Sequence, residues 1–180
     1  MVERVSARMS TGIPRSGRAR ANCIARNSIV LNMMGMTTPT KLEKTLYTAH
    51  ASTTGGRDGR VTTDDGAVDH ALSMPKGLGG SGAAGTNPEQ LFAAGYSACF
   101  GSAIGFVARQ KKLTTGPVKV DAHVSIGPVA SGGFGLAVEL VAHLPELSRG
   151  DAEALVAAAH EICPYSNATR GNIVVDVKVA

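Results

Sequence analysis

The sequence predicts an α+β fold with the element order β-β-α-β-β-α-β. Apolar side chains alternate with polar ones along several short segments, which is the period of a strand buried on one face. Two longer segments carry capping residues and an apolar composition typical of helices. Short glycine-containing connections separate neighbouring strands, so we expect antiparallel pairing with the helices segregated from the strands.

The first part of the chain is expected to form two strands. Alternation over residues 42–49 predicts the first of them. The sequence TTGGRDGR at 53–60 contains an Asp-Gly step among glycines and predicts a hairpin turn. Apolar residues on one face of 68–74 predict a second strand, and the glycine-rich stretch 76–88 is expected to be a long loop.

A long apolar helix is predicted next. Asn87 is a favourable N-cap, Pro88 suits the first helical position, and Glu89 matches the positive end of the helix dipole. The stretch 91–107 carries no charged residue, so we expect it to be buried on most sides. Its many Gly, Ala and Ser residues would let a second helix approach closely.

The last part of the chain is expected to form three strands and a second helix. Residues 118–126 and 134–141 alternate cleanly and are joined by a hairpin connection. Ser148 opens a capping motif for a helix that Pro164 is expected to stop. Alternation over 173–179 predicts the final strand.

Charge divides the chain into a tail, 1–38, and one domain, 39–180. The tail holds six Arg and one Glu and lacks periodicity, so we expect a basic, disordered segment, either for targeting or from upstream translation. The domain holds 12 Lys and Arg against 13 Asp and Glu, which argues against a nucleic-acid partner. No apolar run reaches the roughly 18 residues of a membrane span, so no membrane partner is expected.

Three cysteines, Cys23, Cys99 and Cys163, are too few for a disulfide-rich scaffold. Cys23 lies in the tail, and we expect no role for it. Cys99 lies in the uncharged helix and is either an inert core thiol or a nucleophile activated by a neighbouring cation. Cys163 lies at a helix C-terminus, where the dipole disfavours a thiolate. If the two cooperate, Cys99 is the better nucleophile and Cys163 its partner; otherwise Cys163 is a small apolar residue beneath a loop.

His160 supports two weaker alternatives. Its spacing of three residues from Cys163 suits a metal, but no second Cys/His pair accompanies it, so zinc is disfavoured. It would also suit a hydrolase dyad with Cys99, although no third, orienting residue is evident. By residue type alone, Arg57 is an exposed turn residue and Glu89 is a charge at a helix start.

Four segments, in chain order, carry a likeness to a known family: LYTAHASTTGGRDG, LSMPKGLGGSGAAGTNPEQLFAAGYSACF, GGFGLAVEL and ICPYSNATRGN. Together they resemble the organic hydroperoxide resistance (Ohr) family of the Ohr/OsmC superfamily over about residues 41–180. The resemblance implies an OsmC-like intertwined homodimer in which antiparallel sheets wrap around central helices.

The resemblance also implies roles for four residues. Cys99 would be the peroxidatic cysteine and Cys163 the resolving cysteine. Arg57 would be the cation that activates Cys99, and Glu89 the acid that orients Arg57. The implied activity is that of a cytoplasmic thiol peroxidase that reduces organic hydroperoxides, including those of lipids, to alcohols during oxidative stress.

Such a peroxidase uses no metal or other cofactor; the resemblance implies an external dithiol, a dihydrolipoyl group on a lipoylated protein, as reductant. Two alternatives stay open: a peroxidase of the OsmC branch, and a thiol-based redox sensor without turnover. Glu89 and Cys99 are ten residues apart on one helix, a span of about 15 Å. We therefore hypothesise a site shared between subunits, with Cys99 and Cys163 from one chain and Arg57 and Glu89 from the other.

Overall fold

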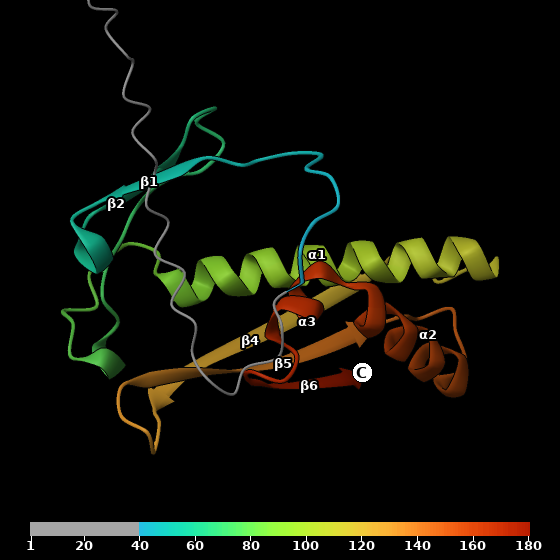
Figure 1. The fold of residues 1–180 in the computed structure, drawn as a ribbon. Helices are drawn as coiled ribbons and strands as arrows, with labels where there is room; N and C mark the ends of the chain where they lie inside the picture. Colours follow the sequence, from blue (N-terminus) through green and yellow to red (C-terminus); the bar gives the residue numbers. More distant parts are fainter. Residues whose placement is uncertain (1–39) are drawn as a thin grey trace, which may run out of the picture. The chain divides into compact units, whose positions relative to one another are not determined.

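The structure, a computed structural model, describes residues 40–180 (Figure 1). The predictions about the basic tail and about Cys23 lie outside these residues. Leu46–Ala180 forms one compact unit. The predicted α+β class is confirmed, but the order of strands and α-helices is β-β-β-α-β-β-α-α-β, so the prediction lacked one strand and one short helix.

The N-terminal sheet has three antiparallel strands in the order β1-β2-β3. They are β1 (Ala51–Thr54), β2 (Arg60–Thr63) and β3 (Asp69–Ala71). The turn predicted over 53–60 is confirmed and contains the single-turn 3-10 helix η1 (Gly56–Asp58). The strand predicted over 42–49 is wrong, because β2 ends opposite Ala51 and no strand within residues 40–180 pairs with the residues before it. β2 itself was missed, since a four-residue strand is too short to show a clear alternation.

The long helix follows as predicted. The loop over 76–88 contains a second 3-10 turn, η2 (Lys76–Leu78), and leads to α1 (Pro88–Lys111). The predicted N-cap is confirmed, since the backbone amide of Gln90 donates to Asn87 Oδ1 over 2.9 Å. Burial on most sides is not found within the chain: apart from Ala103 and Ala108, the small residues of α1 are half-buried or exposed. Its six buried residues are Tyr96, Phe100, Ala103, Ile104, Val107 and Ala108.

The second sheet has the strand order β4-β5-β6. Its strands are β4 (Lys119–Pro128), β5 (Phe134–His143) and β6 (Val174–Val179). β4 and β5 form the predicted antiparallel hairpin, but β6 runs parallel to β5. The expectation of purely antiparallel pairing is therefore wrong for β6. The cause is the helical connection between β5 and β6, because a crossover of this kind returns the chain to the end where a parallel strand begins.

Two helices form that crossover, α2 (Arg149–Ile162) and α3 (Pro164–Thr169). The predicted cap of α2 is confirmed, since the Asp151 amide donates to Ser148 Oγ over 3.2 Å. Pro164 ends α2 as predicted, but it also occupies the first turn of α3, a position where proline is favoured. Cys163 consequently lies between two helices instead of before a loop.

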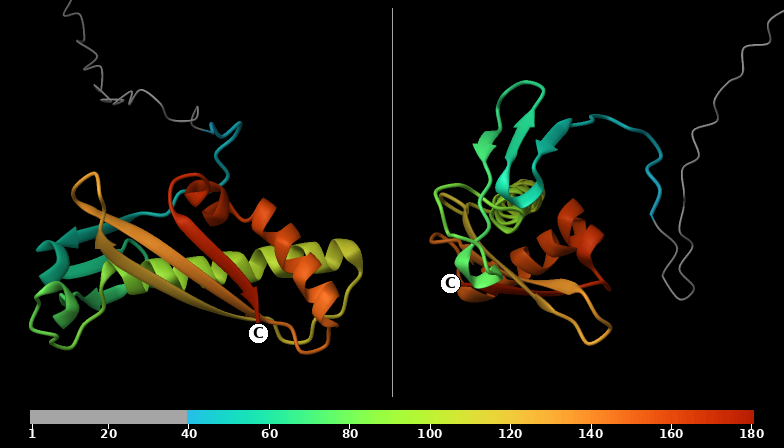
Figure 2. Two further views of the ribbon diagram at one scale, coloured as in Figure 1. Left: turned by 90° about the horizontal axis from the view of Figure 1, so that it is seen from below. Right: turned by 90° about the vertical axis from the view of Figure 1, so that its left-hand side faces the viewer.

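α1 and α2 pack against the second sheet, and Figures 1 and 2 show both helices beside it. α1 contacts β4, α2 contacts β6, and the two helices contact each other. Phe100 of α1, Leu140 of β5, Leu155 of α2 and Cys163 belong to one buried cluster. This packing brings the middle of α1 next to the junction of α2 and α3.

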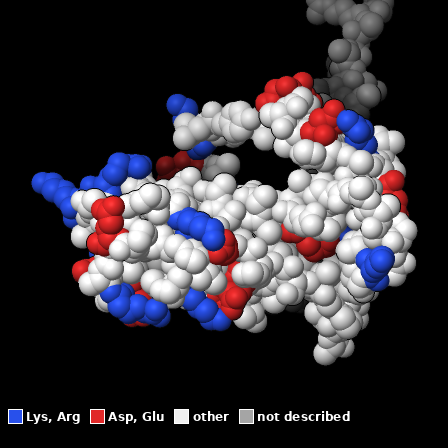
Figure 3. All heavy atoms as spheres, turned by 180° about the vertical axis from the view of Figure 1, so that it is seen from behind, with Lys and Arg blue, Asp and Glu red and all other residues white. Residues whose placement is uncertain are grey.

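The surface and α1 bear on the expected partners. On the face shown in Figure 3, acidic and basic side chains are interspersed and form no patch of one sign. By length and composition alone, α1 would suit a membrane span, with a mean hydropathy of 1.6. The core helix of a water-soluble fold has the same composition, and α1 contacts α2, α3 and β4. The absence of a membrane partner therefore stays a prediction.

Candidate active site

Two cysteines from distant parts of the sequence lie in contact. Cys163 Sγ is 3.5 Å from Cys99 Sγ, although 64 positions separate the residues. Both thiols are free, with Cys163 fully buried and Cys99 half-buried. A disulfide has an S–S length of about 2.05 Å, so the sulfurs need to approach by only about 1.5 Å to bond. The fold therefore favours cooperation of the two thiols among the alternatives that the sequence left open.

Cys163 is held by both of its neighbouring helices. Its backbone amide donates to the carbonyl of Ala159 in α2 over 2.9 Å. Its own carbonyl accepts from the amide of Asn167 in α3 over 2.9 Å. Cys163 is the C-cap of α2, so its predicted place at a helix C-terminus is confirmed, and it is also the N-cap of α3, which the sequence analysis did not foresee.

An aromatic cluster that the sequence analysis did not single out adjoins the cysteines. The rings of Phe92, Tyr96 and Tyr165 pack with centroid separations of 5.6 to 5.9 Å. Gly95 makes room for Tyr165, since a Cβ at this glycine would lie 3.1 Å from the Tyr165 hydroxyl. The contact joins α1 to α3 on the side of α1 that carries Cys99.

The surroundings within the chain favour the thiol form of Cys99. Burial raises the pKa of Cys99, and the neighbouring Cys163 raises it further. A hydrogen bond from the backbone of Tyr165 acts in the opposite direction and lowers the pKa, but burial is the larger effect. The activating cation that the sequence analysis called for is absent from the groups that shift this pKa among the described residues.

Arg57 and Glu89 form a second pair. Arg57 Nη1 donates to Glu89 Oε2 over 2.8 Å, and Nη2 donates to Oε1 over 2.6 Å, which is a bidentate ion pair. The turn that carries Arg57 depends on Gly55 and Gly56, whose φ angles of 78° and 58° favour glycine. The hydrogen bonds to Arg57 lower the pKa of Glu89, and those to Glu89 raise the pKa of Arg57. Both side chains are therefore held in their charged forms.

A cavity of about 420 Å³ opens beside this ion pair. Apart from the ion pair, the residues that line it are Pro88, Phe92, Ile126, Phe134, Gly135 and Leu136. We call it the Arg57 cavity. One ion pair at the edge of an otherwise apolar lining suits a ligand with one polar group and a hydrocarbon body.

The four predicted site residues form two separate pairs within the chain. Among the described residues, no hydrogen bond or ion pair joins Arg57 or Glu89 to either cysteine. Glu89 is in the first turn of α1 and Cys99 lies ten residues further along the same helix, a separation of about 15 Å. A site that contains all four side chains is therefore incomplete in a single chain.

The two weaker alternatives gain no support. His160 packs edge-on against Phe100, with centroids 6.3 Å apart, and burial lowers its pKa. Its buried Nδ1 has no hydrogen-bond partner in the part of the chain that the structure describes. Within 40–180, no three His, Cys, Asp or Glu residues lie close enough together to hold a metal ion.

The α+β fold, with two adjoining thiols between its long helix and its α2–α3 junction, is that of an OsmC-like protein. The family model described as OsmC-like protein matches residues 79–178. Cys99, Cys163, Glu89 and all of the second sheet except Val179 lie in the matched region.

Relatives define the membership more narrowly. The chain is 55% identical to the organic hydroperoxide resistance protein of Xanthomonas axonopodis pv. citri over 139 residues, covering 77% of this chain and 97% of the relative. Identity to OhrB, the organic hydroperoxide resistance protein of Bacillus subtilis, is 48%, covering 74% and 96%. A crystal structure of such a protein from Legionella pneumophila matches with a TM-score of 0.73 and 52% identity, covering 76% and 99%. The chain belongs to the Ohr/OsmC family, as its motifs predicted.

Proposed function

We propose that this protein is a thiol peroxidase that reduces organic hydroperoxides to alcohols in defence against oxidative stress. The observation that carries the proposal is the 3.5 Å contact between Cys99 Sγ and Cys163 Sγ. Two thiols at this distance can form a disulfide with little movement of the backbone. The names of the relatives, organic hydroperoxide resistance proteins, support a peroxide-defence role.

The chemistry requires two steps. The Cys99 thiolate attacks the distal oxygen of the hydroperoxide, an S–O bond forms as the O–O bond breaks, and the leaving alkoxide takes a proton to become the alcohol. Cys99 is then a sulfenic acid. The Cys163 thiol displaces its hydroxyl as water and forms the Cys99–Cys163 disulfide. An external dithiol reduces this disulfide and is itself oxidised to a disulfide, which restores both thiols.

The proposed substrate class is organic, with a hydrocarbon body. The apolar lining of the Arg57 cavity supports this class over hydrogen peroxide, since a small polar peroxide gains nothing from such a surface. In our proposal, the Arg57 guanidinium stabilises the Cys99 thiolate and the alkoxide that forms from the substrate. Glu89 orients Arg57 through the bidentate ion pair.

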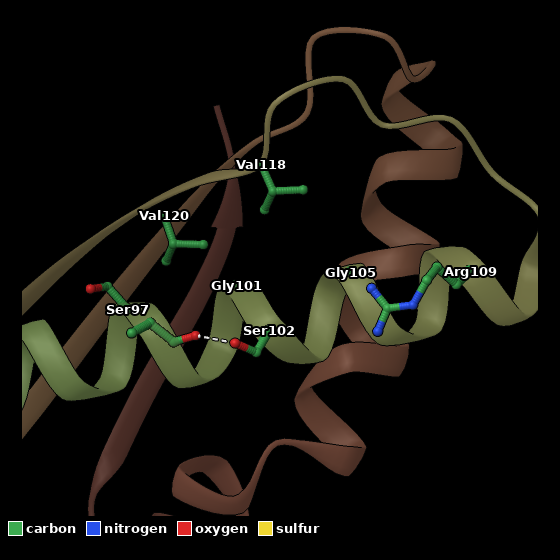
Figure 4. A pocket seen from close by; sticks show the side chains of 8 residues that line it. Ser97, Gly101, Ser102, Gly105, Arg109, Val118 and Val120 are labelled. Carbon is green, nitrogen blue, oxygen red and sulfur yellow. Dashed lines mark hydrogen bonds between the residues drawn. The ribbon is translucent and has the colours of Figure 1, made fainter.

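We further propose that the active site is shared in a homodimer. Along one face of α1, Ser97, Gly101 and Gly105 border a cavity of about 580 Å³ (Figure 4). A Cβ at Gly101 would meet only Val120, at 3.7 Å, so this face has room for another segment. An antiparallel second copy of α1 would bring the partner subunit's Arg57 and the partner subunit's Glu89 toward Cys99. The missing cation at Cys99 supports this arrangement.

The proposed cycle uses no metal or other cofactor, because sulfur carries every oxidation change. The proposed reductant is a dihydrolipoyl group on a lipoylated protein, since a dithiol reopens a disulfide without leaving a mixed disulfide behind. The cytoplasm is the proposed compartment, where a supply of dithiol keeps thiols reduced between turnovers.

Steady-state kinetics test the proposal. With dihydrolipoamide as reductant, we expect many turnovers with cumene hydroperoxide and a much lower kcat/KM with hydrogen peroxide. Cys99→Ser should abolish turnover. Oxidation that stops after one equivalent, with no turnover, would instead identify a redox sensor. Esterase activity that survives Cys163→Ser would point to a cysteine hydrolase.

A further inference from the structure

Three buried hydroxyl groups connect α1, which carries Cys99, to α3, which begins directly after Cys163. The Tyr96 hydroxyl of α1 donates to Ser166 Oγ of α3 over 3.0 Å and lies 3.3 Å from Thr169 Oγ1. Tyr96 and Ser166 have no exposed surface, and Thr169 is 8% exposed. Buried hydroxyl groups are costly unless they are paired, so this cluster specifies how α3 lies against α1. We call it the hydroxyl cluster.

The hydroxyl cluster is in register with the sulfur pair. Tyr96 precedes Cys99 by three residues on α1, and Ser166 follows Cys163 by three residues at the start of α3. Residues three apart lie on the same face of a helix. The contacts Tyr96–Ser166 and Cys99–Cys163 are therefore consecutive contacts along one helix–helix interface.

α3 meets Cys99 through its backbone as well. Tyr165 lies between Cys163 and Ser166, and its backbone lies near enough to Cys99 to lower the pKa of that thiol. A shift of α3 away from α1 would consequently separate the two sulfurs and remove this effect of Tyr165 together. α3 has only six residues, too few to hold its position by helix formation alone.

We propose that Tyr96 is a positioning residue for disulfide formation, which it promotes by holding Ser166 and Thr169, and thereby Cys163, against Cys99. The inference rests on the proposed peroxidase function and concerns its second step. In that step the Cys163 thiol attacks the Cys99 sulfenic sulfur and water leaves. A sulfenic acid that is resolved slowly meets a second hydroperoxide, which oxidises it to a sulfinic acid and is reduced to the alcohol.

The test separates the two steps in the full-length protein. Tyr96→Phe removes one hydroxyl and keeps the ring. With cumene hydroperoxide as oxidant, we expect Cys99 to become a sulfenic acid at the wild-type rate. Disulfide formation should slow by about fivefold to tenfold, the equivalent of one lost hydrogen bond. The fraction of Cys99 recovered as sulfinic acid, measured by mass spectrometry, should rise accordingly.

Ser166→Ala provides a second variant, which also serves if Tyr96→Phe does not fold. It should slow disulfide formation to a similar extent, and the double variant should be little slower than either single one, because both changes break the same bond. Tyr47→Phe removes the hydroxyl of an exposed tyrosine and should match the wild type.

Two results would overturn the inference. One is disulfide formation at the wild-type rate in both single variants. The other is an equal slowing of sulfenic acid formation and disulfide formation, which indicates a general structural role. Failure of the proposed function looks different, because the wild type would then show no turnover of cumene hydroperoxide with dihydrolipoamide, whatever the rate of disulfide formation in the variants.

Discussion

Cys99→Ser is expected to abolish turnover and Arg57→Ala to slow it, and a mixed dimer with one chain of each variant is expected to regain activity. In a shared site, the intact Cys99 of one chain meets the intact Arg57 of the other. The second site of the same dimer carries both substitutions and is dead. A dimer has two equivalent sites, so the mixed dimer should show about half of the wild-type rate.

The control mixture combines Cys99→Ser with Cys163→Ser. The two sulfurs lie 3.5 Å apart in one chain, so every site takes both cysteines from the same subunit. Each site of this mixed dimer then lacks one sulfur, and no activity should return.

The assay uses chains that carry two different affinity tags, so that sequential purification isolates the mixed dimers. The measurement is steady-state consumption of cumene hydroperoxide with dihydrolipoamide. Equal rates in the two mixtures, at the level of the parent variants, would refute the shared site. The four residues would then have to meet within one chain, in an arrangement different from the two pairs found here.

Three further predictions concern the parts of the site separately. Cys163→Ser should oxidise once and then stop, and mass spectrometry should find Cys99 as sulfinic acid instead of a disulfide. Arg57 lowers the pKa of Glu89 in the folded protein. The charged carboxylate therefore stabilises the fold fully at pH values above the usual Glu pKa of about 4.3. This contribution to stability is lost as the pH falls through the lowered pKa of the folded state. The melting temperature of the wild type should therefore exceed that of Glu89→Gln near neutral pH and converge with it in acid; a constant difference at all pH values would contradict this. Asn87→Ala should cost about 1 kcal/mol in urea denaturation, whereas alanine at an exposed asparagine of α3 should cost little.

Short-range features of the fold were predictable from the sequence. The caps at Asn87 and Ser148 depend on a side chain and an amide three residues later. The turn that carries Arg57 depends on adjacent glycines. In each case the interacting groups lie within one turn of chain, so the residue types alone specify the contact.

Contacts between distant segments were not predictable in this way. Tyr96 and Ser166 are 70 positions apart, and neither residue type marks the other as its partner. The parallel pairing of β6 depends on α2 and α3 together, and no local pattern in residues 174–179 distinguishes a parallel strand from an antiparallel one. By residue type alone, the sulfur pair was one of several alternatives for Cys99, and the family resemblance was what singled it out.

The pKa of Cys99 connects the fold to the chemistry. A nucleophilic thiol needs a lowered pKa, yet burial in α1 raises it within a single chain. Moving a pKa down by two units takes about 2.7 kcal/mol of favourable interaction with the thiolate. The hydrogen bond from the Tyr165 backbone acts in this direction but does not overcome burial. A guanidinium in contact with the sulfur would supply the free energy needed to lower this pKa. Within one chain, however, Arg57 is paired with Glu89, which lies in the first turn of α1, the helix that carries Cys99. In the proposed shared site, Cys99 becomes a competent nucleophile when a second chain brings its ion pair to the sulfur, so that dimer formation and activation of the thiol would be the same event.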